Sequence, residues 1–371
     1  MRASLTFGRI FGIPIGVHSS WFLVAALITW SLASGYFPQE YPGWTRMTYW
    51  IVGVITAILF FASVLIHELG HSVVALREGV PVRGITLFIF GGVAQIEREP
   101  PTAGAELRIA IAGPITSLVL AGIFSLLGLT ATLNPVSAAP AVYLGRINLM
   151  LALFNLIPGF PLDGGRVLRA LFWQYGGSFR QATRFATTVG QGVAFLFILF
   201  GVGQIFFGNF LNGLWIAFIG WFLNNAAEAS NQQAILRESL AGVRARDVMT
   251  QQCPTVPGDL RLDRLVHEHI LGTGQRCFFV AGDQGLQGLI TLHNIKALPR
   301  DRWDEVTAGQ VMTPVSTLHW ARPNEDVLVV LQRMDEADVA QIPVMDNGHL
   351  LGMITREHLL HYIRLRSELG I

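Results

Sequence analysis

The chain has 371 residues, of which 51% are hydrophobic and only 14% are charged, and its formal net charge is +1. A mean hydropathy of +0.47 argues against an ordinary soluble protein and favours a membrane protein. The nearly balanced charge gives no indication of nucleic-acid binding. The two cysteines, Cys253 and Cys277, predict neither a disulfide framework nor a thiolate zinc site.

Long apolar runs dominate the chain up to about Ala227, and the sequence after Glu228 is richer in charged residues, with the composition of an ordinary soluble protein. We therefore expect a membrane domain at residues 1–230, a linker at 231–243 and a soluble part from residue 244 onward. No small-residue cleavage site follows the first apolar run, so this run is predicted to be a retained span and not a signal peptide.

Six segments are apolar and long enough to cross a bilayer, for which a helix needs about 20 residues. They are residues 14–35, 48–76, 109–133, 141–172, 185–207 and 210–227. The fourth segment is expected to be irregular because Pro158 and Pro161 interrupt it. A very short turn at Gly208-Asn209 joins the last two, which should form a helical hairpin.

Basic residues concentrate in alternate loops between these segments, and the other loops hold only Arg46. The basic loops carry Arg2 and Arg9; Arg77, Arg83, Arg98 and Arg108; Arg166, Arg169, Arg180 and Arg184; and Arg237, Arg244 and Arg246. Because cytosolic loops carry the excess of basic residues, both termini are predicted to be cytosolic. The expected location is the plasma membrane, crossed several times.

The second apolar segment contains an HExxH pattern, His67-Glu68-Leu69-Gly70-His71. On a helix, His67 and His71 lie one turn apart on the same face, so both imidazoles can bind one zinc ion. Glu68 can then reach a zinc-bound water as general base. Ionisable residues within a membrane are costly and usually functional, which favours an intramembrane metalloprotease.

A catalytic zinc site usually takes three protein ligands, and the fourth apolar segment offers the third. Asp163 is a carboxylate in an apolar context that follows Pro158 and Pro161. Non-helical backbone at membrane depth is tolerated where it lines a polar cavity. His67 lies ten residues before Arg77, which predicts a depth of roughly 15 Å below the cytosolic face, and Asp163 is expected at a similar level.

Four motifs occur together in the apolar half: HELGH (His67–His71), FGG (Phe90–Gly92), AGP (Ala112–Pro114) and FNLIPGFPLDGGR (Phe154–Arg166). Together they resemble the site-2 protease family of intramembrane zinc proteases, and the resemblance covers the whole membrane half. It implies one Zn²⁺ per chain, a transmembrane protein as substrate and a membrane-associated β-loop around Gly91-Gly92.

The resemblance also implies roles for single residues. His67, His71 and Asp163 would bind the zinc ion, Glu68 would activate the water, and Asn155 would hold the substrate backbone or the oxyanion. A structural interhelical hydrogen bond is the competing interpretation of Asn155. The run Ile85–Phe90 predicts a β-strand that pairs with an unwound substrate, with a plain surface hairpin as the alternative.

The charged half contains an internal repeat. RDVMT at Arg246–Thr250 recurs as GQVMT at Gly309–Thr313, and GLIT at Gly288–Thr291 recurs as GMIT at Gly352–Thr355, at offsets of 63 and 64 residues. These offsets predict two copies of one unit, at residues 244–307 and 308–371. The pair resembles tandem cystathionine-β-synthase (CBS) domains.

The CBS resemblance implies clefts for an adenine nucleotide such as ATP or AMP. The implied contacts are Thr291 and Asn294 in the first copy and Thr355 and His358 in the second. The family pattern has an aspartate three residues after the threonine, and both copies lack it. A scaffold that forms a homodimer or docks a partner therefore stays open as the alternative.

The expected fold is a polytopic α-helical membrane protein with six transmembrane helices and a short membrane-associated β-loop, followed by a cytosolic α/β tandem CBS module. The expected function is hydrolysis of peptide bonds in transmembrane or membrane-associated proteins, regulated by the CBS pair. The alternative is a CBS-regulated transporter or channel, which predicts no third ligand matched to HExxH, so Asp163 argues against it.

Overall fold

A computed structural model describes residues 5–369 apart from 90, 97, 131–133, 177, 241, 251–253, 283–284 and 348. Arg2, Phe90 and Cys253, which the sequence singled out, lie outside the described residues. Contacts divide the chain into two compact units, Met1–Ala234 and Ile235–Ile371.

The first unit is a bundle of long helices. Five helical segments among the described residues are long and apolar enough to cross a membrane: Ser20–Glu40, Arg46–Arg77, Ala103–Thr130, Pro135–Asn155 and Phe179–Phe206. The first comprises α1 (Ser20–Ser31), η1 (Leu32–Tyr36) and α2 (Phe37–Glu40), and the others are α3, α4, α5 and α7. The sixth predicted span, 210–227, lies in α8 (Phe210–Leu240) and is not among these five. The chain is therefore a multi-pass membrane protein by the length and composition of its helices.

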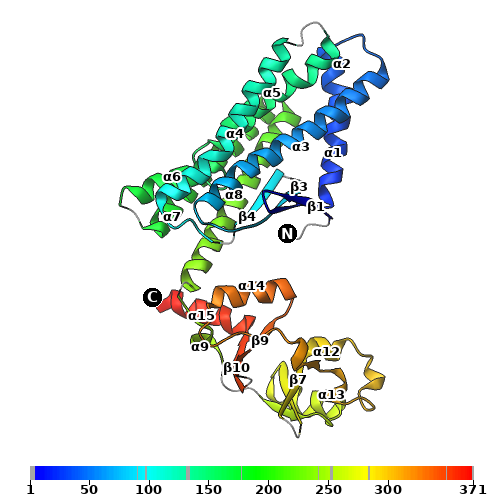
Figure 1. Cartoon of the computed structure of the whole chain (residues 1–371), viewed down its shortest axis with the longest axis vertical. Helices are drawn as coiled ribbons and strands as arrows, with labels where there is room; N and C mark the ends of the chain where they lie inside the picture. The colour runs from blue at the N-terminus through cyan, green and yellow to red at the C-terminus, as the bar shows by residue number, and fades with distance from the viewer. Residues whose placement is uncertain are drawn as a thin grey trace. The chain divides into compact units, whose positions relative to one another are not determined.

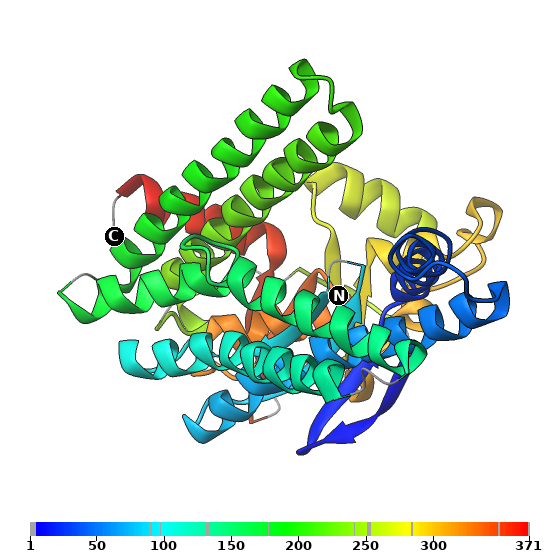
Figure 2. The same ribbon diagram turned by 90° about the horizontal axis from the view of Figure 1, so that it is seen from above.

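Local signals in the sequence set where these helices begin. The side chain of Thr45 accepts a hydrogen bond from the Thr48 amide at the start of α3, and Asn134 accepts one from Val136 at the start of α5. Ser178 and Gln181 form a capping box at the start of α7. Such caps satisfy amide groups that a first helical turn leaves without partners. α3, α4 and α5 then pack side by side (Figure 1 and Figure 2).

Two predicted spans differ from the observed elements. Residues 14–35 do not form one helix, because Ile13–Val17 is strand β2 and helix α1 starts at Ser20. Pro14 and Gly16 disfavour a helix, while Ile13, Ile15 and Val17 alternate with them and are buried. Residues 141–172 contain two helices, α5 and α6 (Asp163–Gln174), separated by an irregular segment as the prolines predicted.

The predicted β-loop is part of a four-stranded sheet with the order β1-β2-β3-β4. Its strands are Leu5–Ile10, Ile13–Val17, Val82–Phe88 and Gly91–Ile96. Ile13, Ile15 and Ile85 of the sheet pack against Leu69, which lies inside the HExxH motif. The sheet therefore covers α3 at the level of the candidate site.

The pairing in this sheet corrects one prediction. The strand predicted at Ile85–Phe90 is β3, and β3 pairs in parallel with β2 on one side and antiparallel with β4 on the other. Its hydrogen-bonding edges are both occupied, so β3 cannot also accept a substrate strand. Among the described strands of this sheet, β1 and β4 are paired on one side only.

The second unit contains two α/β cores. One sheet has the order β5-β6-β7-β8 (Thr255–Pro257, Cys277–Gly282, Gly285–Thr291 and Thr313–Pro314), and the other is the hairpin of β9 (Gln341–Asp346) and β10 (His349–Thr355). The helices with more than ten residues here are α14 (Val327–Ala337) and α15 (Arg356–Leu369). Short helical turns make up most of the rest, namely α9 (Ala245–Val248), α10 (Leu262–Arg264), η2 (Leu265–Ile270), α11 (Leu271–Thr273), α12 (Leu292–Lys296), η3 (Arg300–Arg302), α13 (Ala308–Val311) and η4 (Val315–Thr317).

The two sequence copies exchange their opening segments. Thr250, from the first copy, pairs with Met353 in β10 of the second, and Thr313, from the second copy, pairs with Leu289 in β7 of the first. The side chain of Val248 accordingly belongs to the core of the second copy. Each core is thus completed by a segment from the other copy, which joins the two copies into one folding unit.

Candidate metal centre

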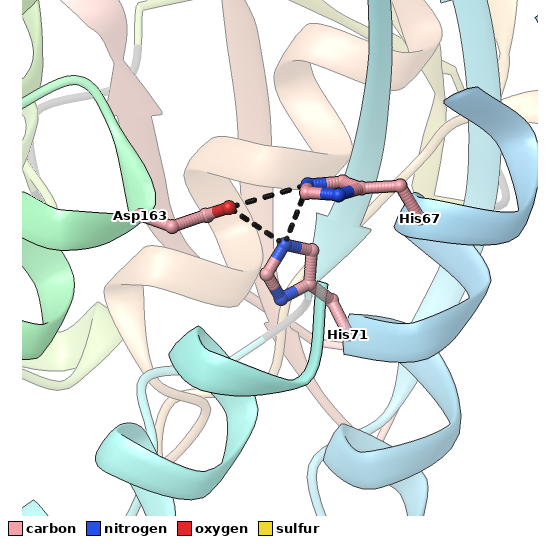
Figure 3. A group of neighbouring side chains, drawn as sticks. All are labelled: His67, His71 and Asp163. Carbon is pink, nitrogen blue, oxygen red and sulfur yellow. Dashed lines mark hydrogen bonds and ion pairs between the residues drawn. The ribbon is translucent and has the colours of Figure 1, made fainter. Parts of the chain in front are cut away.

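Two histidines and one aspartate converge where α3 meets the first residue of α6 (Figure 3). The Nε2 atom of His67 lies 3.2 Å from Oδ2 of Asp163, and Nε2 of His71 lies 3.1 Å from the same oxygen. The two Nε2 atoms lie 3.3 Å apart. Both histidines are 4% exposed, so this polar group is enclosed by protein.

These distances fit a single zinc ion. Zinc binds imidazole nitrogen and carboxylate oxygen at about 2.0–2.1 Å in a tetrahedral arrangement, which places neighbouring ligand atoms about 3.3 Å apart. The three donor atoms observed here are separated by 3.1–3.3 Å. Two imidazoles and one carboxylate also leave a fourth position for water or substrate, as catalytic zinc sites do.

The second nitrogen of each imidazole has a partner on α4. Nδ1 of His71 donates to the main-chain oxygen of Ile109 at 2.7 Å, and Nδ1 of His67 hydrogen bonds to the Ser117 hydroxyl at 2.8 Å. Such partners fix the ring orientation and leave Nε2 free to face a metal. Sequence reasoning did not find Ile109 or Ser117, although the AGP motif between them pointed to this helix.

Gly113, the middle residue of the AGP motif, lies directly against the imidazoles of His67 and His71. A Cβ atom on Gly113 would collide with Nε2 of His71 and would also lie too close to Nε2 of His67. The main chain of α4 therefore forms one wall of the candidate site, where only glycine leaves room for the imidazoles.

Glu68 lies on α3 beside strand β4. The main-chain amide of Ala94 donates a hydrogen bond to the Glu68 carboxylate. Gly92, two residues earlier in β4, has no side chain, and a Cβ atom there would collide with the side chain of Glu68. The carboxylate proposed from the sequence as general base is thus held at an unpaired edge of the sheet.

The irregular segment between α5 and α6 places Asp163. The chain leaves α5 at Asn155, and Leu162 is in extended conformation before Asp163 opens the next helix. A Cβ atom on Gly164 would collide with the carbonyl oxygens of Leu156 and Ile157. The glycine after the aspartate thus allows α6 to begin directly against the end of α5.

Asn155 does not hydrogen bond to the His67, His71 and Asp163 group. It is the last residue of α5, and its side-chain amide donates to the carbonyl oxygen of Leu151 at 3.0 Å. Asn148, two helical turns earlier, is the residue that links helices, because its amide donates to Ser63 on α3 at 3.2 Å.

A cavity of about 440 Å³ in the second unit is lined by Thr291 and Asn294 among other residues. Asn294 already has several partners, because its Oδ1 accepts hydrogen bonds from the amide and hydroxyl of Thr291 at 3.0 and 2.6 Å. Its Nδ2 donates to Thr313 at 3.2 Å. Thr355 accepts a hydrogen bond from the His358 amide at 3.1 Å, and this second pair does not line the cavity.

Comparison with known proteins adds a family context. A model described as "Peptidase family M50" matches residues 55–136 and 130–199, and a model described as "CBS domain" matches residues 245–300 and 308–365. The chain is 37% identical over 365 residues to "Putative zinc metalloprotease sll0528" of Synechocystis sp., covering 97% of this chain and 95% of that protein.

Two further matches are similar in kind. The chain is 37% identical over 338 residues to "Putative zinc metalloprotease Rip3" of Mycobacterium tuberculosis, covering 90% of this chain and 86% of that protein. A solved structure entitled "Site-2 Protease from Methanocaldococcus jannaschii" is 30% identical and gives a TM-score of 0.43, covering 61% of this chain and 94% of that one.

Proposed function

Because the chain belongs to peptidase family M50, the site-2 type of zinc metalloprotease, and carries a CBS pair, we propose that it hydrolyses transmembrane or membrane-associated proteins. The active site would be the zinc site formed by His67, His71 and Asp163. The observation that carries this proposal is the convergence of two imidazole nitrogens and one carboxylate oxygen within 4.8 Å. Membership in a protease family argues against the alternative of a CBS-regulated transporter or channel.

In this proposal His67, His71 and Asp163 hold one zinc ion per chain. A zinc ion there would supply a water of lowered pKa and would polarise the scissile carbonyl. Glu68 would take the proton of the attacking water and pass it to the leaving amine. The protein walls around both histidines would exclude bulk water and keep these charge interactions strong.

Asn155 would bind the substrate backbone or the oxyanion in this proposal. Its side-chain amide now donates to the Leu151 carbonyl, so this hydrogen bond would have to break when substrate binds. The competing role is structural, at the end of α5. Replacement of Asn155 by Asp would distinguish them, because a substrate contact predicts a change in catalysis with unchanged zinc content.

The substrate would approach the unpaired edge of β4. Peptide hydrolysis inside a membrane requires the substrate helix to unwind, and an extended peptide can add to an open sheet edge. The amide of Ala94 already donates to Glu68, which places this edge beside the proposed base.

The membrane topology of the proposal has six spans, with α8 as the sixth, in the plasma membrane. Both termini would be cytosolic, because the basic residues gather in alternate loops. The CBS pair would then lie in the cytosol and could sense a soluble ligand.

The CBS pair would regulate the protease, with an adenine nucleotide such as ATP or AMP as the candidate ligand. Arg276 and Lys296 line the cavity beside Thr291, and their positive charges suit a phosphate group. Regulation would be a shift between two arrangements of the pair. The alternative is a scaffold that forms a homodimer or docks a partner, and Thr355 and His358 then have no nucleotide role.

The first experiment measures the metal content of the detergent-purified protein beside Asp163→Ala and His67→Ala. The proposal expects about one zinc ion per chain in the wild type and its loss or marked weakening in both variants. A wild type without metal, or metal binding indifferent to Asp163, would contradict the proposal.

The second experiment separates metal binding from catalysis. Glu68→Gln is expected to keep zinc and to abolish cleavage of a membrane protein substrate, because an amide cannot accept the proton of water. Continued cleavage by this variant would show that Glu68 is not the base.

A further inference from the structure

A buried ion pair joins α4 to α6 close to the candidate metal centre. Oε1 of Glu106 accepts hydrogen bonds from Nε of Arg169 at 2.7 Å and from its NH2 group. The side chain of Glu106 is 0% exposed and that of Arg169 is 7% exposed. Burying two charges is expensive, so such a pair indicates a constraint more specific than general stability.

Arg169 is also held from its other sides. Its guanidinium lies over the rings of Phe160 and Phe179, 5.0 and 4.5 Å from their centroids. Its NH1 group donates to Thr183 at 3.5 Å, and its NH2 group lies 3.5 Å from the carboxylate of Glu99. The position of this guanidinium, and of the helix that carries it, is therefore narrowly defined.

A second arginine of α6 faces the same carboxylate. Nε of Arg166 lies 4.0 Å from Oε1 of Glu106. Arg166 and Arg169 lie three and six residues after Asp163, on the two helical turns that follow it. Glu106 thus attracts both basic residues of the short helix that presents the third donor.

The other end of the connection is the partner of His71. Glu106 precedes Ile109 by three residues on α4, and the Ile109 carbonyl accepts the Nδ1 hydrogen of His71. One turn of α4 therefore contacts the histidine helix through Ile109 and the aspartate helix through Glu106.

We propose that Glu106 is a positioning residue that, through Arg169 and Arg166, sets the distance of Asp163 from His67 and His71. This inference rests on the proposed zinc site, and assigns a role to a charge that the hydrolytic chemistry does not use. Without the Glu106 charge, α6 loses its attachment to α4 and Asp163 loses its fixed place opposite the imidazoles.

The test is a double-mutant cycle on zinc affinity in the full-length protein, measured by competition with a chelator. Glu106→Gln is expected to weaken zinc binding about tenfold or more, the range for residues that support metal ligands. In the Asp163→Ala background, Glu106→Gln should change the remaining affinity by less than about twofold, because its effect passes through Asp163.

Glu78→Gln is the matched control. Glu78, at the end of α3, forms a bidentate ion pair with Arg108 in the first turns of α4, at 2.6 and 2.8 Å. The Arg108 side chain is 60% exposed, so this pair is far more open to solvent than the pair of Glu106 and Arg169. Exposed pairs contribute little, so zinc affinity should stay within about twofold of the wild type.

Equal loss of affinity in both backgrounds would assign Glu106 a general structural role and overturn the inference, as would unchanged affinity in Glu106→Gln. If Glu106→Gln does not fold, Arg169→Lys replaces it in the same cycle. Lysine keeps the positive charge of Arg169 but cannot form the bidentate contact with Glu106. A wild type that binds no zinc would overturn the proposed function itself, whereas normal zinc binding that depends on Asp163 but not on Glu106 overturns this inference alone.

Discussion

Nδ1 of His67 lies 2.8 Å from the hydroxyl oxygen of Ser117, a residue fifty positions later on α4. His71 is held by the same helix, but through the main-chain oxygen of Ile109. One imidazole therefore depends on a side chain that can be removed, and the other depends on a backbone group that substitution leaves in place.

Ser117→Ala is expected to weaken zinc binding about tenfold, because the His67 ring loses the partner that orients it. Thr116→Ala is the control, since the Thr116 hydroxyl donates only to Ala112 of its own helix. Chelator competition on both purified variants measures the effect. Equal affinities in the two variants would contradict a specific role for Ser117.

Gly113→Ala is expected to abolish zinc binding, because the added methyl group would occupy the space of the His71 and His67 nitrogens. Gly122→Ala on the same helix is the matched control, since nothing lies within 4 Å of a Cβ atom there. Metal analysis of both proteins provides the measurement. Retention of a full zinc ion by Gly113→Ala would show that the donors lie elsewhere.

Asn294→Asp is expected to strengthen adenine nucleotide binding about tenfold. The substitution restores the aspartate of the family pattern, and a carboxylate accepts hydrogen bonds more strongly than the present amide oxygen, which Thr291 occupies. His358→Asp provides a comparison at the copy whose contacts do not line the cavity. Calorimetric titration with ATP and with AMP measures both, and no binding by any variant would favour the scaffold alternative.

Deletion of residues 244–371 is expected to leave a membrane protein that still binds zinc. The residues up to Ala234 form a compact unit of their own, and all three candidate donors lie within it. Zinc analysis of the truncated protein checks this, and the truncated protein that also carries His67→Ala is the metal-free control. Loss of metal from the monodisperse truncated protein would mean that the CBS pair contributes to the site.

The apolar runs, the HExxH motif and the segment that carries Asp163 predicted much of this architecture. HExxH needs only a helix to bring His67 and His71 together, and the aspartate that follows two prolines, Asp163, lies beside them as the third candidate donor. The CBS copies were visible because their strands repeat at a nearly constant offset. These are local or periodic signals, which one sequence can carry.

The missed features depend on contacts between distant segments. Residues 14–17 were assigned to a transmembrane helix because buried strands and buried helices are equally apolar. They belong to β2, whose pairing with β3 joins residues about seventy positions apart. The partner of His71 is a carbonyl group, which every residue possesses, so no residue type marks Ile109. Likewise, the exchange that pairs Thr250 with Met353 leaves no trace in the repeat itself.

The three candidate donors are far apart in the order of synthesis. His71 precedes Asp163 by 92 residues, and the partners on α4 are made in between. A nascent chain that ends before α6 therefore carries only two of the three donors. At this candidate site, peptidase activity would consequently require synthesis of the chain at least as far as α6.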